Sequence, residues 1–294
     1  MIPRRFLYHA PADLREAIRL LSDDPGAKVL AGGQSLLPLM KLRLTSPSAL
    51  VDISKIRDLA YVRDESDHLS IGALTTHDRI EHSQVIGERF AMVADAVSGV
   101  GDQQVRNRGT IGGSVCHADP AGDLPTALLS ADARFIIEDG GQDRVVPVEE
   151  FFIDPFKTAL KHAEILREIR LPYLPPNSAS AFTKHTLREA DRAVALVGCS
   201  VSLNDDSKCG RVRIGIGGVG AKPTRAEAAE EYLVGKALDD LTMAETAERA
   251  VEDVDPISDI RGSREYRLEV VKVLTRRTLR TAVGRLRSET SVGV

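Results

Sequence analysis

The alternation of apolar and polar residues predicts short helices and strands intermixed along the first part of the chain. Apolar residues recur at helical spacing over residues 13–21, 36–44, 88–97 and 124–130. Apolar runs predict strands at residues 28–31, 49–53, 133–138, 144–148 and 164–171, and a hairpin from residues 59–62 and 69–73. Thr76 is expected to cap a helix that begins at His77.

The pattern changes after a cluster of prolines, Pro172, Pro175 and Pro176, which we interpret as a domain boundary. Strands are predicted next, at residues 181–186, 194–203 and 211–219. Helices follow them, at residues 225–232, 242–251 and 264–283. Strands followed by helices indicate an α+β domain whose antiparallel sheet is covered on one face.

Composition and charge narrow the class of protein. The chain has 294 residues, of which 43% are hydrophobic and 28% charged, so it can bury a core large enough for two or three domains. A net charge of −4, a pI of about 6.0 and the lack of tryptophan argue against a nucleic-acid-binding or membrane-surface protein.

Targeting signals and cysteine spacing indicate a cytoplasmic protein. No apolar run approaches the ~20 residues of a membrane span. Residues 1–14 are charged and lack the apolar core of a signal peptide. Cys116, Cys199 and Cys209 stand too far apart in the sequence for a paired metal or redox motif. A reducing compartment is therefore expected.

Residues 108–125, RGTIGGSVCHADPAGDLP, form the most distinctive stretch of the sequence. Glycine and proline are so frequent here that the stretch is predicted to be neither helix nor strand. Gly112 and Gly113 can adopt positive φ and carry no Cβ, so a ligand can lie directly against their backbone N–H groups. A tight structural turn is the alternative.

Polar side chains in the same stretch favour a dinucleotide. Thr110 and Ser114 add hydroxyl donors, and the carboxylates of Asp119 and Asp123 follow as acceptors. Donors followed by a carboxylate suit a ligand that has both a pyrophosphate and a polyol.

A second glycine-rich stretch, residues 31–38 (AGGQSLLP), lies between a predicted strand and a predicted helix. That arrangement points backbone N–H groups at an anion, although a βα turn without a ligand is the alternative. Gly215, Gly217 and Gly220 also satisfy the GxGxxG pattern. No helix begins close enough to face them, so we interpret them as a structural strand end.

Residues 31–44 and 108–125 together resemble the flavin-binding subunits of the molybdenum hydroxylase, or xanthine dehydrogenase, family. This family includes the medium subunit of aerobic carbon monoxide dehydrogenase. The resemblance extends through residues 51–56, 70–80 and 182–191 and the helical C-terminus. It implies an α+β fold: an FAD-binding domain of the vanillyl-alcohol-oxidase (PCMH) type over residues 1–175, with subdomains at about 1–56 and 57–175. A smaller α+β domain like that of carbon monoxide dehydrogenase flavoproteins would follow at 176–294.

The family role that the resemblance implies is electron transfer by an FAD-dependent oxidoreductase subunit. Two [2Fe-2S] clusters in a small partner subunit would reduce the flavin, which passes electrons to an external acceptor. Substrate would be hydroxylated at molybdopterin in a large partner subunit, so both other cofactors belong to partners of a heterotrimer that can itself dimerise. FAD is expected to bind non-covalently, because flavin-linked relatives use histidine where this chain has Gln34.

The resemblance also assigns roles to residues. The first glycine motif would hold the pyrophosphate from one side and the second motif from the other. Asp123 would bind the sugar–ribityl portion, Lys184 would lie near the flavin ring, and His117 would line the site. The expected cofactor-binding residues are Ala31, Gly32, Gly33, Gln34, Ser35, Leu36, Thr110, Ile111, Gly112, Gly113, Ser114, His117, Asp123 and Lys184. No catalytic side chain and no metal ligand is expected in this chain.

Two other functions remain open. A self-sufficient flavin oxidase or reductase would need its own substrate pocket, and the C-terminal portion shows no constellation of catalytic groups. A scaffold subunit that has lost its flavin is disfavoured by the intact glycine pairs and by Asp123. A thiol nucleophile at Cys116 beside His117 is disfavoured, because adjacent side chains rarely point at each other.

One departure from the family concerns Arg192. Many relatives have an aromatic residue after the aspartate that corresponds to Asp191. Near the flavin ring, the Arg192 guanidinium would favour the reduced, anionic flavin. The alternative is an exposed turn in which Arg192 pairs with Asp191 or Glu189.

Overall fold

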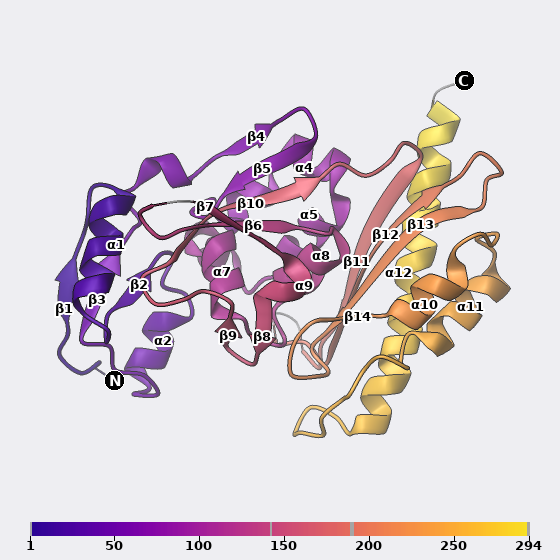
Figure 1. Cartoon of the computed structure of the whole chain (residues 1–294). Coiled ribbons are helices and arrows are strands. Elements are labelled where there is room, and N and C mark those ends of the chain that lie inside the picture. Colours follow the sequence, from indigo (N-terminus) through magenta and orange to yellow (C-terminus); the bar gives the residue numbers. More distant parts are fainter. Residues whose placement is uncertain (1, 142, 189–190, 293–294) are drawn as a thin grey trace.

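The computed structural model describes residues 2–141, 143–188 and 191–292, and the side chains up to residue 288. Within this part of the chain, the strands form sheets of three, five and four strands and a small two-stranded hairpin. The sheets follow one another along the sequence, with the indigo N-terminal layer at one end of the molecule and the orange and yellow C-terminal elements at the other (Figure 1). Among the described residues, no helix combines the length and apolar character needed to span a bilayer.

The N-terminal layer is a parallel sheet in the order β1-β3-β2. Its elements are β1 (Leu7–His9), α1 (Leu14–Asp23), β2 (Lys28–Leu30), α2 (Leu36–Lys41) and β3 (Ala49–Asp52). The Asp13 carboxylate caps α1 by accepting from the Glu16 N–H, and α1 buries Ile18 and Leu21 in a cluster with Val51 of β3. The first glycine motif therefore follows the carboxyl end of β2.

The central layer is a five-stranded antiparallel sheet in the order β4-β5-β10-β6-β7. Its strands are β4 (Val62–Asp64), β5 (His68–Gly72), β6 (Arg134–Glu138), β7 (Asp143–Pro147) and β10 (Ile165–Pro172). The helices of this region are η1 (Arg57–Leu59), α3 (His77–Glu81), α4 (Gln84–Arg89), α5 (Ala91–Ser98), α6 (Gln103–Arg108), α7 (Ile111–His117), α8 (Asp123–Ser130) and α9 (Val148–Phe151). The hairpin of β8 (Phe152–Asp154) and β9 (Lys157–Thr158) precedes β10.

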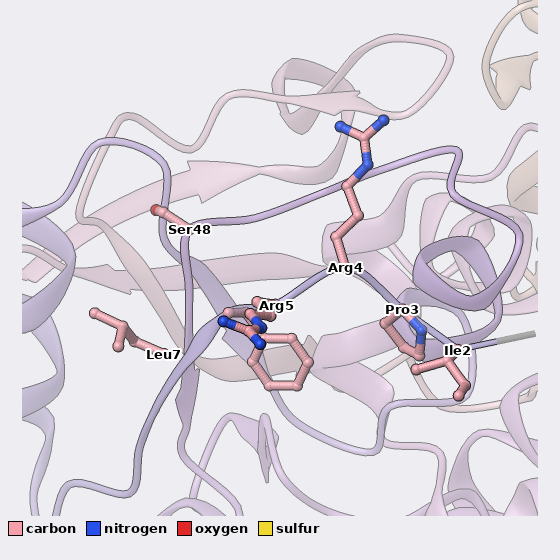
Figure 2. Close-up of a pocket in the computed structure, with 7 residues that line it drawn as sticks. Ile2, Pro3, Arg4, Arg5, Leu7 and Ser48 are labelled. Carbon is pink, nitrogen blue, oxygen red and sulfur yellow. The ribbon is translucent and has the colours of Figure 1, made fainter.

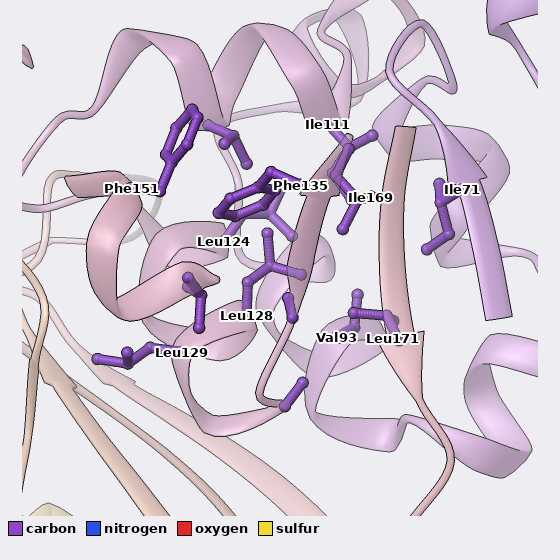
Figure 3. Close-up of a cluster of buried hydrophobic side chains, with 14 of the residues drawn as sticks. Ile71, Val93, Ile111, Leu124, Leu128, Leu129, Phe135, Phe151, Ile169 and Leu171 are labelled. Atoms are coloured by element: carbon purple, nitrogen blue, oxygen red, sulfur yellow. The ribbon is translucent and has the colours of Figure 1, made fainter. Parts of the chain in front are cut away.

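The main hydrophobic core lies between this sheet and its helices. Figure 3 shows Phe135 and Ile169 of the sheet against Leu128 of α8, with Ile111 of α7 beside them; all four are fully buried. Because α7 and α8 share this core, the second glycine motif is anchored at both ends by apolar packing.

The C-terminal part is an antiparallel sheet in the order β11-β12-β13-β14. Its elements are β11 (Ser178–His185), β12 (Ala195–Leu203), β13 (Cys209–Gly217), β14 (Thr224–Arg225), α10 (Glu227–Leu233), α11 (Asp240–Arg249) and α12 (Arg264–Val292). The prediction that the helices of this part cover one face of its sheet is confirmed, and the other face packs on the central layer. Helices α10 and α12 cover one face, and α5 and α8 of the central layer cover the other (Figure 1).

Glycines on the sheet allow α8 to approach it. A Cβ on Gly215 would lie 2.6 Å from Ser130 Oγ and 2.8 Å from the Thr126 carbonyl oxygen, and a Cβ on Gly217 would collide with the Thr126 side chain. Close helix–sheet packing therefore explains the first two glycines of the GxGxxG pattern, which supports its structural interpretation; a Cβ on Gly220 would lie 3.3 Å from the Asp255 carbonyl oxygen.

Most predicted elements are confirmed, and three differ. The first strand of the predicted hairpin begins at Val62 rather than Leu59, because residues 57–59 form η1. The helix predicted at 88–97 is two helices that break at Phe90. Residues 111–117, predicted to be non-helical, form α7. Burial of Ile111 and Val115, together with the Thr110 cap, outweighs the low helix propensity of two glycines.

Candidate functional site

A cavity of about 910 Å³ lies where the N-terminal layer, the central layer and the C-terminal sheet meet. Both glycine motifs line it, and so do the β8–β9 hairpin and residues 160–166. Lys184 of β11 and Arg192, which precedes β12, line it from the C-terminal part. Three parts of the chain that are far apart in sequence thus build one site.

A second hollow lies along the N-terminal segment, where Leu7 donates a backbone hydrogen bond to Ser48 at 2.8 Å. Figure 2 labels six of its lining residues, Ile2, Pro3, Arg4, Arg5, Leu7 and Ser48; Phe6 also lines it. It contains neither glycine motif and no acidic or nucleophilic group beyond one hydroxyl, so the larger cavity is the candidate site.

The first motif presents free backbone donors to the cavity. Gly33 has a φ of +74°, a conformation that glycine adopts without strain. Within the described residues, no hydrogen-bond acceptor faces the backbone N–H groups of Gln34, Ser35 and Leu36. Unpaired N–H groups at the end of a strand form a suitable binding site for an anion.

The two motifs touch each other directly. A Cβ on Gly32 would collide with the Arg108 carbonyl oxygen and lie 2.8 Å from the Gly109 Cα. A Cβ on Gly113 would lie 3.8 Å from the Ala31 Cβ. Glycine is therefore required at residue 32 for the contact, and at residue 113 it keeps the space between the motifs open.

The second motif differs from its prediction. Gly112 and Gly113 are helical and have no positive φ. Their N–H groups are already engaged: Gly112 donates to the Ala73 carbonyl oxygen at 2.9 Å, and Gly113 to the Thr110 hydroxyl at 3.1 Å. The prediction of free donors at these two glycines is therefore wrong, because the Ala73 carbonyl oxygen and the Thr110 hydroxyl already accept their N–H groups. Gly112 instead allows close packing, since a Cβ there would lie 2.6 Å from the Ala73 Cβ.

The structure brings nearly all of the predicted site residues to one cavity. Those that line it are Ala31, Gly32, Gly33, Gln34, Ser35, Leu36, Thr110, Gly112, Gly113, Ser114, His117, Asp123 and Lys184. Ile111 is fully buried in the main core and does not line the cavity.

Asp123 and Lys184 form a buried ion pair at one end of the cavity. The Lys184 ammonium donates to Asp123 Oδ2 and to the Gly99 carbonyl oxygen, both at 3.0 Å. It also lies 3.0 Å from Oδ1, which receives no hydrogen bond. Burial raises the pKa of Asp123 to about 6, against the opposing effect of the Lys184 charge.

Stability should therefore depend on pH through Asp123. The pKa of Asp123 is about 6 in the folded protein and 3.8 ordinarily. The protonated carboxyl therefore contributes fully to the free energy of unfolding below pH 3.8, and this contribution is lost as the pH rises through 6. Asn does not titrate. From pH 4 to pH 7 we therefore expect the unfolding free energy of Asp123→Asn, measured relative to that of the wild type, to rise by up to about 3 kcal/mol. Urea unfolding of the apoprotein measures this, with Asp119→Asn as the control. An equal difference at both pH values would contradict the prediction.

Three further lining residues come from the second motif and its neighbour. The His117 ring lies 5.2 Å from the Phe156 ring, centroid to centroid, and burial lowers the pKa of His117. Burial raises the pKa of Cys116 to about 12, so its thiol is not a nucleophile at neutral pH. The disfavoured thiol-hydrolase chemistry therefore has no support.

Arg192 lies at the cavity but has a different partner from those predicted. Its guanidinium donates to Asp119 Oδ1, and its side chain is half exposed. Asp191 accepts the Arg192 backbone N–H, at 2.7 Å, and its carboxylate pairs with Arg261 at 3.9 Å rather than with the Arg192 guanidinium. Glu189 lies outside the described residues. Arg192 thus joins the second motif to the C-terminal part, and Asp119 offsets its charge.

Sequence reasoning missed one wall of the cavity. Phe156 and Lys157 of the β8–β9 hairpin, the segment 160–166, and His77 at the start of α3 all line it. The Phe156 N–H donates to the Ala118 carbonyl oxygen at 2.9 Å, which fixes the hairpin against the second motif. These residues carry no local sequence signal of their own, because only the folded chain brings them to the motifs.

Comparison with known proteins gives two family matches. Residues 4–174 match the family described as the FAD binding domain in molybdopterin dehydrogenase. Residues 180–282 match the carbon monoxide dehydrogenase flavoprotein C-terminal domain.

Similar proteins cover almost the whole chain. The 6-hydroxypseudooxynicotine dehydrogenase complex subunit alpha of Paenarthrobacter nicotinovorans is 36% identical over 98% of this chain and 97% of its own length. The carbon monoxide dehydrogenase medium chain of Hydrogenophaga pseudoflava is 35% identical over 97% of this chain and 99% of its own.

Solved structures of similar proteins have the same fold as this chain. Carbon monoxide dehydrogenase from Hydrogenophaga pseudoflava, in a form that lacks the Mo-pyranopterin moiety of its cofactor, superimposes with a TM-score of 0.93 and 36% identity. Quinoline 2-oxidoreductase from Pseudomonas putida 86 gives 0.92 and 35%. Each match covers 97% of this chain and 99% of the other.

Proposed function

The chain belongs to the family of FAD-binding subunits of molybdopterin dehydrogenases, and from this we propose that it transfers electrons within a molybdenum-containing hydroxylase complex. It is an oxidoreductase subunit of the medium-chain type. The observation that carries the proposal is the meeting of two glycine motifs, about eighty residues apart in sequence, at one cavity.

The cavity fits FAD in three respects. Free N–H groups at Gln34, Ser35 and Leu36 can donate to a pyrophosphate. The absence of a side chain at Gly113 leaves room between the motifs for it. Among the described residues, none donates a hydrogen bond to the buried Oδ1 of Asp123, so a ligand hydroxyl can supply one.

We assign roles to the lining residues accordingly. The first motif holds the pyrophosphate with its backbone donors, and Thr110 and Ser114 lie across from it. Asp123 accepts from the sugar–ribityl portion, while Lys184 holds a positive charge near the ring end, beside His117. When bound, FAD supplies a group that accepts and releases electrons. The chain binds it, orients it and provides the charge around it.

We propose the finer fold assignment on the same basis. An FAD-binding domain of the PCMH type spans residues 1–175, with subdomains at about 1–56 and 57–175. A C-terminal domain of the carbon monoxide dehydrogenase flavoprotein type spans 176–294. The support is that the three main sheets lie within residues 7–52, 62–172 and 178–225, on either side of these boundaries.

We propose an iron–sulfur small subunit and a molybdopterin large subunit as partners. Electrons pass from [2Fe-2S] clusters to FAD and on to an external acceptor. The support is that several similar proteins are, by name, medium chains or subunits of dehydrogenases or of a hydroxylase. We propose a cytoplasmic location, for which the support is three free, scattered cysteines, Cys116, Cys199 and Cys209.

Purification of the tagged chain from its own host should recover iron, acid-labile sulfide and molybdenum together with FAD. Because the clusters and molybdopterin belong to the partners, the isolated recombinant chain should contain FAD alone. Metal analysis and flavin absorbance measure both preparations. If the chain purified from its own host carries FAD but recovers no partner, it is a self-sufficient oxidase or reductase. A complex without FAD would indicate a scaffold.

A further inference from the structure

His77 is a buried titratable residue at the cavity to which neither the sequence motifs nor the flavin assignment gives a role. It begins α3, is 3% exposed and lines the cavity. Its Nδ1 is buried and has no hydrogen-bond partner in the part of the chain that the structure describes. Buried polar atoms in folded proteins are nearly always paired, so an unpaired ring at a ligand cavity requires an explanation.

The imidazole is fixed in place by the glycine motifs. The His77 backbone N–H donates to the Gly109 carbonyl oxygen at 2.9 Å. A Cβ on Gly109 would lie 2.7 Å from His77 Cδ2 and 3.0 Å from Nε2, so only glycine lets the ring lie here. Gly109 in turn touches Gly32. His77, Gly109 and Gly32 therefore form one packed row beside the space between the two motifs.

The ring is uncharged at neutral pH. Burial lowers the pKa of His77 to about 4, and the nearby Arg106 guanidinium acts in the same direction. Arg106 is itself paired with Glu81 at 2.7 Å, and among the described residues no carboxylate pairs with the His77 ring. A neutral imidazole offers one donor and one acceptor and adds no net charge.

We propose that the His77 imidazole hydrogen-bonds an oxygen of the polyol–pyrophosphate portion of the bound dinucleotide. This inference rests on the proposed function, since it takes the cavity ligand to be FAD. The packed row with Gly109 and Gly32 places the ring beside the portion that the two motifs enclose. The ligand then satisfies a group that the apoprotein leaves unpaired, and His77 is a positioning residue that binds without changing the charge of the site.

The test uses the apoprotein, two substitutions and FAD as the probe. His77→Leu removes the ring nitrogens, and we expect it to raise the Kd for FAD about tenfold, the effect of losing one neutral hydrogen bond. The same variant should unfold at or above the wild-type Tm, because it removes an unpaired buried group. His77→Asn, which returns an amide near Nδ1, should restore the Kd to within about threefold of the wild type.

His82→Leu is the matched control, because His82 lies at the end of the same helix with an exposed side chain. It should change neither the Kd nor the Tm. If the wild-type apoprotein does not bind FAD, the proposed function fails. If the wild type binds FAD and His77→Leu binds it equally well, only this inference is overturned. A His77→Leu variant that loses Tm and affinity together indicates a structural role and also overturns it.

NMR of the wild-type protein with ¹⁵N-labelled histidine tests the proposal even if His77→Leu does not fold. Saturation with FAD should shift the His77 ring nitrogens, while those of His82 stay unchanged. An unchanged His77 resonance would overturn the proposal.

Discussion

Replacing Gly113 by valine should abolish tight FAD binding and leave the fold largely intact. Gly113 lies in α7 with its Cα facing the first motif: a Cβ there would lie 2.9 Å from Thr110 Oγ1 and 3.8 Å from the Ala31 Cβ. The two valine methyl groups would extend into the gap proposed for the pyrophosphate. Hydrogen bonds to a charged group contribute about 1.5–3 kcal/mol each, so losing several weakens binding by orders of magnitude.

A flavin-fluorescence titration of the apoprotein measures this affinity. The control is Gly87→Val in α4, where a Cβ would meet no atom within 4 Å. Because Gly113 is helical rather than at positive φ, the expected loss comes from filling the gap and not from backbone strain. An FAD affinity within tenfold of the wild type would reject this placement of the pyrophosphate.

Lys184→Met should strongly destabilise the apoprotein at pH 8. The Asp123 carboxylate is buried and has Lys184 as its hydrogen-bond donor, so the substitution leaves a buried charge unpaired. Breaking such a pair costs about 3–5 kcal/mol. The loss should be much smaller at pH 5, because the pKa of Asp123, already about 6, rises further without the ammonium and the carboxyl is then neutral.

Urea unfolding at the two pH values measures the effect. The double variant Lys184→Met with Asp123→Asn is the control, since it removes the unpaired charge and should recover most of the stability at pH 8. A loss for Lys184→Met that is the same at pH 5 and pH 8, or a double variant no more stable than the single one, would contradict this account of the pair.

The sequence predicts most of the secondary structure because apolar spacing and capping residues are local signals. Thr76 caps α3 as expected, since an N-cap needs only a side chain three residues before its donor. The prediction fails at α7, where Ile111 and Val115 pack into a core built by distant strands. The low helix propensity of glycine can be recognised from the local sequence, but the packing against distant strands that overcomes it cannot.

Some features of the site could likewise be predicted from the sequence, and others could not. The two glycine motifs could be found because their residue types are special, and the resemblance connects them. The positions of the free donors could not be predicted: they lie at Gln34, Ser35 and Leu36. The N–H groups of Gly112 and Gly113 are taken by the Ala73 carbonyl oxygen and by the Thr110 cap, and the contact with Ala73 forms only in the folded chain. The Asp119–Arg192 pair and the position of His77 depend on how the layers meet, which no local pattern records.

The most direct test of the central claim is the flavin content of the purified chain after denaturation in acid. Gln34 has an amide that is not a nucleophile, and its Nε2 donates to the Gly32 carbonyl oxygen at 3.1 Å. We therefore predict about one FAD per chain, all of it released into the supernatant. A chain that binds no flavin when FAD is supplied, or flavin that stays with the precipitated protein, would contradict the account.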